Sequence, residues 1–355
     1  MHTPVTAVVA QTAKAKPGRP VPDRIPVPGF LSRVRPASKA TAVSLCPASA
    51  VITTAPSRFQ PTAEQEAILT ATSALRPDSV LGVVAFAGAG KTSTLKMIAA
   101  ALRGSGIYTA FNRDIVLAGQ AAFPPSIRCK TAHSIAYAAM GIRRDETENL
   151  NGHSVLKLLD EAPGRWLSQD AAGVKPIGQA RLVAKAVTEF CQSADIALTE
   201  AHVEQVLTKF FYRVPNETPT DTNARKAHDE MMARRNRLAP AILVNAREAW
   251  KRLSAWRQHG VKVAHDVYLK TFELDTDLVA RTFAGFDFVL FDEAQDVNGV
   301  MRSIVAKCGR RVIAVGDPWQ SIYSWRGAED ALGRLPGERL YLSQSFRFGE
   351  AVAAV

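Results

Sequence analysis

The sequence has 355 residues, of which 47% are hydrophobic, and a formal net charge of +11. This length leaves room for two or three domains with a substantial core. Charged residues interrupt every apolar run before it reaches the length of a bilayer span, so a membrane protein is not expected. Its four cysteines have no paired spacing, which predicts a reducing compartment and neither a zinc site nor a disulfide framework.

Residues 1–58 hold eight Lys and Arg residues against one Asp, so this segment carries +7 of the charge and residues 59–355 carry +4. The segment is rich in Pro, Ala and Ser and lacks helical or strand periodicity, which predicts a disordered tail. An organellar transit peptide is the alternative, although the prolines disfavour the amphipathic helix that such a peptide needs. Because most of the charge lies in the tail, it supports a polyanionic partner without requiring one.

From residue 59 onward the pattern is that of a folded α/β protein. A helix is predicted to start at Pro61–Thr62, with Glu64 and Glu66 in its first turn and Ile68 on its apolar face. Short apolar runs bounded by polar or glycine-containing turns then recur, which predicts a parallel sheet flanked by helices. These runs are residues 80–88, 107–111, 127–131, 286–293, 310–317 and 339–345.

Between the third and fourth runs the periodicity is helical, which predicts a helical insertion between two halves of one sheet. Val183, Val187 and Phe190 share one face. A second shared face consists of Val203, Val206, Leu207 and Phe210. The expected division is a tail at 1–58, the first part of the sheet domain at 59–140, the insertion at 141–283 and the second part at 284–355.

A basic run within the insertion, Arg234, Arg235 and Arg237, precedes Pro240. A further helix is predicted after this proline, through Trp250–Trp256. A solvated helix face is the ordinary explanation of such a run, and a DNA-contacting track is the alternative.

The run GVVAFAGAGKTSTL places a glycine-rich turn between a strand and a helix, as a phosphate-binding loop requires. Its glycines let backbone N–H groups approach phosphates, Lys91 would neutralise phosphate charge and Thr92 would ligate Mg²⁺. Ala85 stands where the usual pattern has its first glycine, so an ordinary turn containing Lys and Thr is the alternative. The predicted nucleotide-binding residues here are Ala87, Gly88, Ala89, Gly90, Lys91, Thr92 and Ser93.

Two adjacent carboxylates, Asp292 and Glu293, end the apolar run FDFVLFDE. Asp292 is placed to hold Mg²⁺, directly or through water, and Glu293 to orient and deprotonate an attacking water. A helix N-terminus, where acids are favourable, is the alternative. The phosphate loop upstream favours the catalytic interpretation.

The later segment VGDPWQSIYSWRGA combines the polar Gln320 with Tyr323, Trp325 and Arg326. Aromatic faces stack on bases of any sequence, and arginine adds positive charge. Together with the carboxylates, this segment suggests nucleotide hydrolysis coupled to a nucleic-acid strand.

The series of motifs resembles, in its order, superfamily 1 helicases of the UvrD/Rep type over roughly residues 59–355. AGAGKT, DEAQD and VGDPWQSIYSWRGA are similar to the first three motifs of that family, and YLSQSFRF resembles the fourth. YTAFNRDIVLAG and CKTAHSIAY resemble the Ia and Ib segments that line the DNA path. AFNRD, KTAHSIAY, SADIA and HDVYLK are particularly similar to the F-box DNA helicase branch.

The resemblance implies a P-loop (RecA-like) lobe that uses ATP and Mg²⁺. It implies that Gln65 recognises adenine, that Gln320 senses the γ-phosphate and that Arg347 stabilises its developing charge. Thr92 and Asp292 would be the metal ligands. The implied catalytic set is Lys91, Asp292, Glu293, Gln320 and Arg347.

The resemblance also implies single-stranded DNA as a partner. Buried core aromatics are the alternative for Phe111 and Tyr323, and a hydrogen-bonded core histidine is the alternative for His133. The implied DNA contacts are Phe111, Asn112, Thr131, His133, Tyr323, Trp325 and Arg326.

The implied function is an ATP-dependent 3′–5′ DNA helicase or single-strand translocase in DNA repair or recombination. It would act in the cytoplasm, associated with the nucleoid of a bacterium, or in the nucleus of a eukaryote.

The fifth and sixth family motifs are not recognisable, so we expect a fragment whose second RecA-like lobe lies in a continuation or a separate chain. Weak nucleotide binding and no unwinding are expected of it alone. A non-catalytic module that binds ATP and single-stranded DNA is the alternative, whereas a nucleotide kinase has no use for SIYSWRGA.

Overall fold

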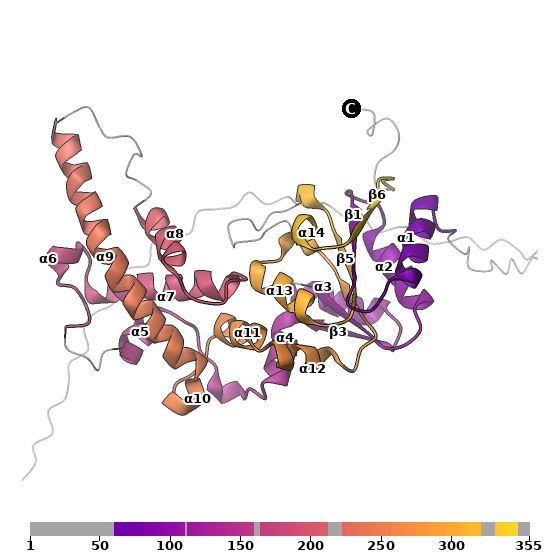
Figure 1. Ribbon diagram of the computed structural model, residues 1–355, viewed down its shortest axis with the longest axis horizontal. Helices are drawn as coiled ribbons and strands as arrows, with labels where there is room; N and C mark the ends of the chain where they lie inside the picture. The colour runs from indigo at the N-terminus through magenta and orange to yellow at the C-terminus, as the bar shows by residue number, and fades with distance from the viewer. Residues whose placement is uncertain (1–59, 111, 160–163, 212–221, 321–330, 347–355) are drawn as a thin grey trace, which may run out of the picture. The chain divides into compact units, whose positions relative to one another are not determined.

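The computed structural model describes residues 60–110, 112–159, 164–211, 222–320 and 331–346. Each of the six predicted apolar runs contributes one strand to a single parallel sheet (Figure 1). The strands are β1 (Val80–Ala85), β2 (Gly106–Ala110), β3 (Ile127–Thr131), β4 (Phe288–Phe291), β5 (Arg311–Gly316) and β6 (Glu338–Leu342).

The two halves of the sheet interleave, because the strand order is β3-β2-β4-β5-β1-β6. Strands β4 and β5, which follow the helical segment, lie between β2 and β1, which precede it. Since all pairs are parallel, the carboxyl ends of β1, β2, β4 and β5 meet at one edge of the sheet. Ligands bind at such an edge in open α/β sheets.

Alternate strand residues belong to two buried clusters, as the period of two in a strand requires. Leu81 and Val83 face the first cluster, which is completed by helices that follow or precede the early strands. Val80 and Val84 face the second. The first cluster includes α1 (Ala63–Ala74), α2 (Lys91–Ala101) and α3 (Arg113–Ala122); the second includes α4 (Ala132–Ala139), α12 (Thr276–Phe283), α13 (Gly299–Lys307) and α14 (Ala331–Arg334).

The second cluster continues without interruption into the helices between β3 and β4. The predicted face of α7 (Pro176–Gln192) is buried, with Val183, Val187 and Phe190 fully inside the protein. The predicted face of α8 (Glu200–Phe210) is buried except for Phe210, which is 46% exposed. The elements of this segment are η1 (Arg144–Glu146), α5 (Gly152–Leu159), α6 (Gln169–Ala172), α7 (Pro176–Gln192), α8 (Glu200–Phe210), α9 (Thr222–Ser254), α10 (Trp256–His259) and α11 (His265–Leu274).

The prediction of a separate helix after Pro240 is wrong, because α9 runs through this proline as one helix of 33 residues. Proline removes one helical hydrogen bond and crowds the preceding turn. The neighbouring Leu238 and Ile242 are fully buried in the second cluster. Burial of these side chains offsets the local cost of the proline, so tertiary packing overrides the sequence signal.

Within the described helices, none combines the length and apolar composition needed to cross a bilayer.

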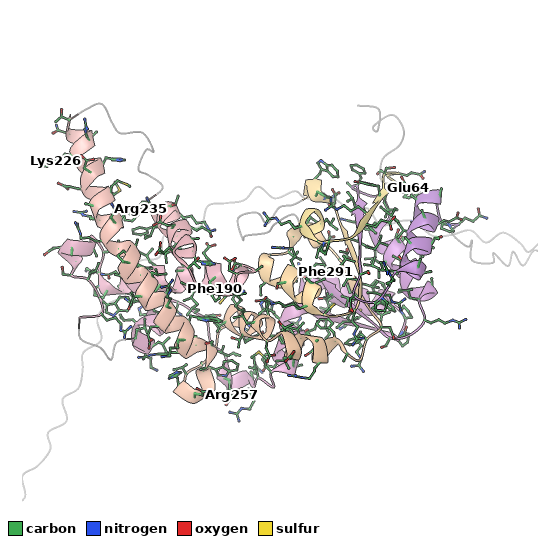
Figure 2. All side chains as sticks on the ribbon, viewed as in Figure 1. Glu64, Phe190, Lys226, Arg235, Arg257 and Phe291 are labelled. Carbon is green, nitrogen blue, oxygen red and sulfur yellow. The ribbon has the colours of Figure 1, made fainter. Side chains whose placement is uncertain are left out.

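The basic run of α9 makes contacts within the protein. Arg235, labelled in Figure 2, is paired with Glu204 of α8 and donates to the Thr208 hydroxyl at 3.3 Å. Nε of Arg237 donates to the carbonyl of Ala171 at 2.9 Å. These two arginines therefore attach α9 to α8 and α6.

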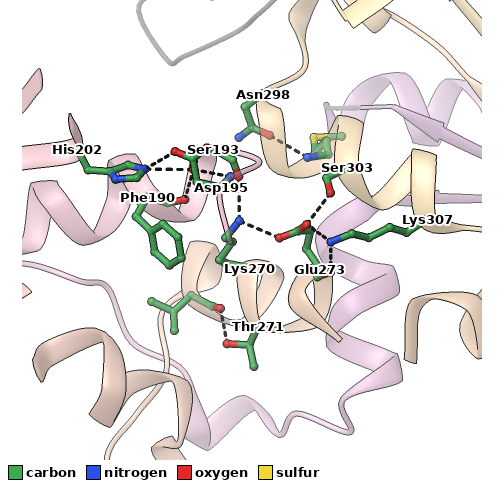
Figure 3. A network of polar contacts seen from close by, with 12 residues as sticks. Phe190, Ser193, Asp195, His202, Lys270, Thr271, Glu273, Asn298, Ser303 and Lys307 are labelled. Carbon is green, nitrogen blue, oxygen red and sulfur yellow. Dashed lines mark hydrogen bonds and ion pairs between the residues drawn. The ribbon is translucent and has the colours of Figure 1, made fainter. Parts of the chain in front are cut away.

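A buried network of charged groups joins α11 to α13 and to the segment after α7 (Figure 3). Nζ of Lys270 lies 2.8 Å from Oε2 of Glu273, and both side chains have no solvent exposure. Lys270 also donates to the carbonyl of Ser193 at 3.1 Å, while Glu273 accepts from Ser303 at 2.5 Å and from Lys307. Burial alone would raise the pKa of Glu273, but the hydrogen bonds from Lys270, Lys307 and Ser303 lower it below its ordinary value.

Candidate nucleotide site and nucleic-acid interface

The glycine-rich turn connects β1 to α2 at the carboxyl edge of the sheet. Gly88 and Gly90 have φ angles of 73° and 82°, in the left-handed region that glycine adopts without a Cβ penalty. Helix α2 begins at Lys91, so Lys91, Thr92 and Ser93 form its first turn, and Thr92 and Ser93 are exposed. The backbone N–H groups of such a first turn have no partner within the helix and suit a phosphate.

The departure at Ala85 has a structural explanation. Ala85 is the last residue of β1, pairs with Leu342 of β6 and is fully buried. Its backbone is that of an ordinary strand, so no glycine is needed there. The two conformationally demanding positions are Gly88 and Gly90, and both carry glycine.

Lys91 and Glu293 form an ion pair that joins the glycine-rich loop to the end of β4. Nζ of Lys91 lies 3.2 Å from Oε2 of Glu293, with side-chain exposures of 14% and 27%. Glu293 has a φ of 51°, which is uncommon for a residue other than glycine. A phosphate at the loop would compete with Glu293 for this ammonium group.

Asp292, the residue before Glu293, is buried, with 4% exposure. Its Oδ2 accepts from the Tyr108 hydroxyl at 2.6 Å and its Oδ1 accepts from the backbone N–H of Glu293 at 2.9 Å. Burial raises the pKa of Asp292, although the hydrogen bond from Tyr108 acts in the opposite direction. Burial and the Asp292 carboxylate raise the pKa of Tyr108, which therefore remains a hydroxyl donor at neutral pH.

The oxygen groups at this edge fit the requirements of Mg²⁺. Each carboxylate oxygen has two acceptor sites, so Asp292 keeps capacity beyond its two hydrogen bonds. The Thr92 hydroxyl, which is exposed, would supply a second oxygen. Magnesium takes one or two carboxylates and completes its shell with phosphate oxygens and water. Across the described ranges, no group of three or more His, Cys, Asp or Glu side chains is placed to hold a metal. Magnesium bound mainly by phosphate oxygens and water does not need such a group.

Gln295 connects the carboxylates to the segment after β5. Its Nε2 donates to Oε2 of Glu293 at 2.8 Å, and its Oε1 accepts from the backbone N–H of Asp317 at 2.9 Å. Gln295 is buried, and a Cβ on Gly316 would lie 2.6 Å from its Oε1. The glycine before Asp317 is therefore required for this close approach.

Gln65 lies beside the glycine-rich loop, but its side chain is occupied within the protein. Its Oε1 accepts from the backbone N–H of Thr62, and the Thr62 hydroxyl accepts from the backbone N–H of Gln65. This capping box starts α1 at the predicted position. Nε2 of Gln65 donates to the Thr94 hydroxyl at 3.1 Å and lies 3.4 Å from where a Cβ of Gly90 would be.

The segment that follows β6 runs along the same loop. Backbone N–H of Phe346 donates to the carbonyl of Gly88 at 3.0 Å, and the Ser345 hydroxyl donates to the carbonyl of Ala87 at 2.9 Å. The polypeptide is thus held against the loop up to the residue before Arg347.

Gln320 ends the 3₁₀ helix η3 (Pro318–Gln320) and is exposed. Its backbone N–H donates to the carbonyl of Asp317 at 3.0 Å. The preceding Trp319 stacks on Phe86, with ring centroids 4.7 Å apart and planes inclined by 21°. Phe86 immediately follows β1, at the start of the glycine-rich loop. The stacking therefore attaches Trp319, the neighbour of Gln320 in the chain, to the start of this loop.

Of the predicted DNA contacts, Asn112 lies two residues after the end of β2, and Thr131 is the last residue of the neighbouring strand β3. Both act as helix N-caps: Asn112 accepts from the backbone N–H of Asp114 at 2.9 Å, and Thr131 accepts from that of Ser134 at 3.2 Å. These caps give each residue a structural role, and a polynucleotide contact there remains a prediction.

His133 lies on α4 with a third of its side chain exposed, so it is not a core histidine. Its Nε2 is 3.7 Å from Oδ1 of Asp266 on α11. Its ring makes edge contacts with His265 and Tyr268 of the same helix. The structure thereby brings together the segments CKTAHSIAY and HDVYLK.

The remaining predicted site residues lie outside the described residues: Phe111, Tyr323, Trp325, Arg326 and Arg347.

Sequence reasoning missed the residues that support the carboxylates. Gln295 and Asp317 are part of the quoted motifs but had no assigned role. Tyr108 is the one hydroxyl-bearing aromatic in the run IYTAF, which was a signal that a buried polar partner was needed. Nothing in the local pattern names Asp292 as that partner, because strand order alone makes β2 and β4 neighbours.

Comparison with known proteins gives consistent matches. Residues 123–332 match the family model of the UvrD/REP helicase N-terminal domain. F-box DNA helicase 1 of Gallus gallus is 31% identical over 281 residues, which cover 78% of this chain and 25% of that protein. F-box DNA helicase protein 1 of Schizosaccharomyces pombe is 26% identical over 289 residues, covering 79% and 30% respectively.

A third match, to a probable DNA helicase II homolog of Mycoplasma genitalium, is 30% identical over 106 residues, covering 26% of this chain and 15% of the relative. The chain spans between a quarter and a third of the length of the two F-box helicases. The family match includes Asp292, Glu293 and Gln320, whereas Lys91 precedes it.

Proposed function

The chain belongs to the UvrD/REP helicase family, because its residues 123–332 match the N-terminal domain of that family, and we propose that it is the ATP-hydrolysing lobe of a DNA helicase. The observation that carries the proposal is the ion pair between Lys91 and Glu293 beside the buried Asp292. A phosphate-binding lysine, a carboxylate able to take a proton and a carboxylate able to hold Mg²⁺ are the parts that phosphoryl transfer to water requires.

In the proposed reaction, Lys91 exchanges Glu293 for the phosphates of ATP, while backbone N–H groups of residues 87–93 bind the same phosphates. This exchange leaves the Glu293 carboxylate free to orient a water and accept its proton. Thr92 and Asp292 would hold Mg²⁺, which supplies charge neutralisation at the phosphates when bound. Gln65 is proposed for adenine, and Gln320 and Arg347 for the γ-phosphate.

Single-stranded DNA is the proposed polynucleotide. Its proposed contacts lie at the carboxyl ends of β2 and β3, at Asn112, Thr131 and His133. Further proposed contacts are Phe111, Tyr323, Trp325 and Arg326, whose types suit base stacking and phosphate binding.

Several broader assignments, which the family resemblance of the sequence implies, are also proposals for this chain. They are 3′–5′ movement, a role in repair or recombination, a partner RecA-like lobe, and action in the nucleus of a eukaryote or at the nucleoid of a bacterium. The domain limits at 59–140, 141–283 and 284–355 also remain predictions.

The proposal is tested by comparing Lys91→Ala with Lys96→Ala, an exposed lysine on the same helix α2. We expect Lys91→Ala to weaken Mg·ATP binding by tenfold or more, on the order of the loss of one charge-assisted contact of about 1.5–3 kcal/mol. Lys96→Ala should bind ATP like the wild type. Equal ATP binding by both variants would contradict the proposed site.

The same proteins then distinguish the two functional classes. ATP turnover stimulated by single-stranded DNA and lost in Lys91→Ala supports the helicase lobe. Stable binding of ATP and single-stranded DNA without turnover supports the alternative, a non-catalytic module.

A further inference from the structure

A pair of exposed aromatic rings stacks at the edge of the sheet where the nucleotide site lies. The ring centroids of Phe86 and Trp319 are 4.7 Å apart and their planes are inclined by 21°. Trp319 is 69% exposed and Phe86 is 37% exposed, and neither belongs to the two buried clusters of the sheet. Burial of apolar surface, which scales with the area removed from water, therefore contributes little to this contact.

The two rings come from segments that follow neighbouring parallel strands. Strands β1 and β5 pair with Val84 opposite Gly316, and both segments leave the sheet at its carboxyl edge. Phe86 opens the glycine-rich loop, while Trp319 directly precedes Gln320. The stack thus connects the loop to the segment that carries Gln320.

Phe86 provides a fixed support for this connection. Its backbone N–H donates to the carbonyl of Leu342 at 3.0 Å, and its carbonyl accepts from the backbone N–H of Ala89 at 3.0 Å. The first bond attaches Phe86 to β6 and the second attaches it to the glycine-rich loop. A ring that rests on Phe86 is therefore held in a defined position relative to that loop.

On the other side of the stack, one buried residue orients both Trp319 and Gln320. Oδ1 of Asp317 accepts from the backbone N–H of Trp319 at 3.1 Å, and the carbonyl of Asp317 accepts from that of Gln320 at 3.0 Å. Asp317 is 1% exposed, and its own N–H donates to Gln295. The single turn η3 is thus fixed at its base by Asp317 and at its exposed side by the Trp319 ring.

We propose that Phe86 and Trp319 are positioning residues, whose stacking sets Gln320 against the γ-phosphate and so determines how strongly the site prefers ATP to ADP. This inference rests on the proposed ATP-hydrolysing function. A 3₁₀ helix of one turn has poor hydrogen-bond geometry and does not hold its own orientation. An offset stack of two rings restricts both the distance and the angle of that turn.

The preference for ATP is the property that such positioning controls. ADP lacks the γ-phosphate, so a displaced Gln320 weakens binding of ATP and leaves binding of ADP unchanged. The rings themselves need not contact the nucleotide for this effect. The ratio of the two affinities therefore separates a positioning role from a direct contact.

The experiment measures the affinity of the full chain for Mg·ADP and for the Mg complex of the non-hydrolysable β,γ-imido analogue of ATP. The variants are Trp319→Ala, Trp319→Phe, Phe86→Leu, Gln320→Ala and the double variant Trp319→Ala/Gln320→Ala. Phe86→Leu removes the stack from the other side and keeps the apolar bulk, so it tests the pair even if Trp319→Ala is unstable. Phe210→Ala, which removes an exposed aromatic ring on α8, is the matched control.

We expect Gln320→Ala to lower the ratio of ATP-analogue to ADP affinity by about tenfold, since a hydrogen bond to a charged group is lost. Trp319→Ala and Phe86→Leu should lower the same ratio by about three- to tenfold, the range for loss of an aromatic pair. Trp319→Phe should restore most of the ratio because it can still stack. The double variant should match Gln320→Ala, because residues that act through one another are not additive.

An unchanged ratio in Trp319→Ala and Phe86→Leu would overturn the proposal. Equal losses of ATP-analogue and ADP affinity would show that a ring contacts the nucleotide itself, and additive losses in the double variant would show that Trp319 acts independently of Gln320; either result also overturns it. Lys91→Ala, measured alongside, reports on the proposed function. If Lys91→Ala weakens both nucleotides while the stack variants keep the wild-type ratio, the nucleotide site stands and only this inference fails.

Discussion

The carboxamide oxygen of Gln295 accepts a hydrogen bond from the backbone N–H of Asp317 at 2.9 Å, while its nitrogen donates to Glu293 at 2.8 Å. One buried side chain thus joins the carboxylate that pairs with Lys91 to the segment that leads to Gln320. If Glu293 moves when Lys91 turns to phosphate, the change reaches Asp317 through a single residue.

Replacing Gln295 with Ala is expected to reduce DNA-stimulated ATP turnover more than Mg·ATP binding. The substitution leaves the backbone N–H of Asp317 without its acceptor, at a cost of about 1–3 kcal/mol, and removes the constraint on Glu293. Turnover with and without single-stranded DNA and nucleotide titration measure the two effects. Gln258→Ala, at an exposed site on α10, is the control. Equal losses of binding and turnover would argue against a coupling role.

Gly299→Ala is expected to destabilise the fold by about 1–3 kcal/mol through overpacking. A Cβ at Gly299, the first residue of α13, would lie 2.6 Å from the backbone N of Ala194. Gly285→Ala is the matched control, because a Cβ there meets nothing within 4 Å. Denaturant unfolding of both variants measures the difference, and equal stability would show that the segment after α7 is free to shift.

Lys270→Ala is expected to destabilise the protein by about 3–5 kcal/mol, because it leaves the buried Glu273 without one of its cations. Nζ of Lys270 also lies 4.9 Å from the centroid of the Phe190 ring, a contact that is lost with it. The exposed Lys185→Ala should stay within about 0.5 kcal/mol of the wild type. A small loss for Lys270→Ala in thermal or chemical unfolding would mean that Lys307 alone compensates Glu273.

The stability of the fold should decrease in acid through Glu146. Hydrogen bonds from Arg257 and from the backbone N–H of Arg143 lower the pKa of Glu146 from 4.5 to about 2. A lowered pKa contributes stability above pH 4.5, and this contribution is lost as the pH falls from 4.5 through about 2. The difference in unfolding free energy between the wild type and Glu146→Gln should therefore shrink across this interval. A difference that does not depend on pH would show that the hydrogen bonds, and not the ionised carboxylate, are responsible.

Local patterns were sufficient for the strands and for some of the helices. Apolar runs of strand length between turns predicted the six strands of the described sheet. Pro61–Thr62 predicted the start of α1, where the structure has a capping box at Thr62. Pro240 shows where a local rule fails, because burial of Leu238 and Ile242 keeps α9 continuous. A residue pattern describes the preference of a segment, and packing against distant segments can outweigh it.

The sequence by itself determined the glycine-rich turn before Lys91, the adjacent pair Asp292 and Glu293, and the resemblance to the UvrD/Rep helicases. These features depend on residues that are neighbours in the chain. Tertiary structure alone decided that Tyr108 supports Asp292 and that Gln295 joins Glu293 to Asp317. The physical reason is that strand order and helix packing set these contacts, and neither is recorded in the local periodicity of the chain.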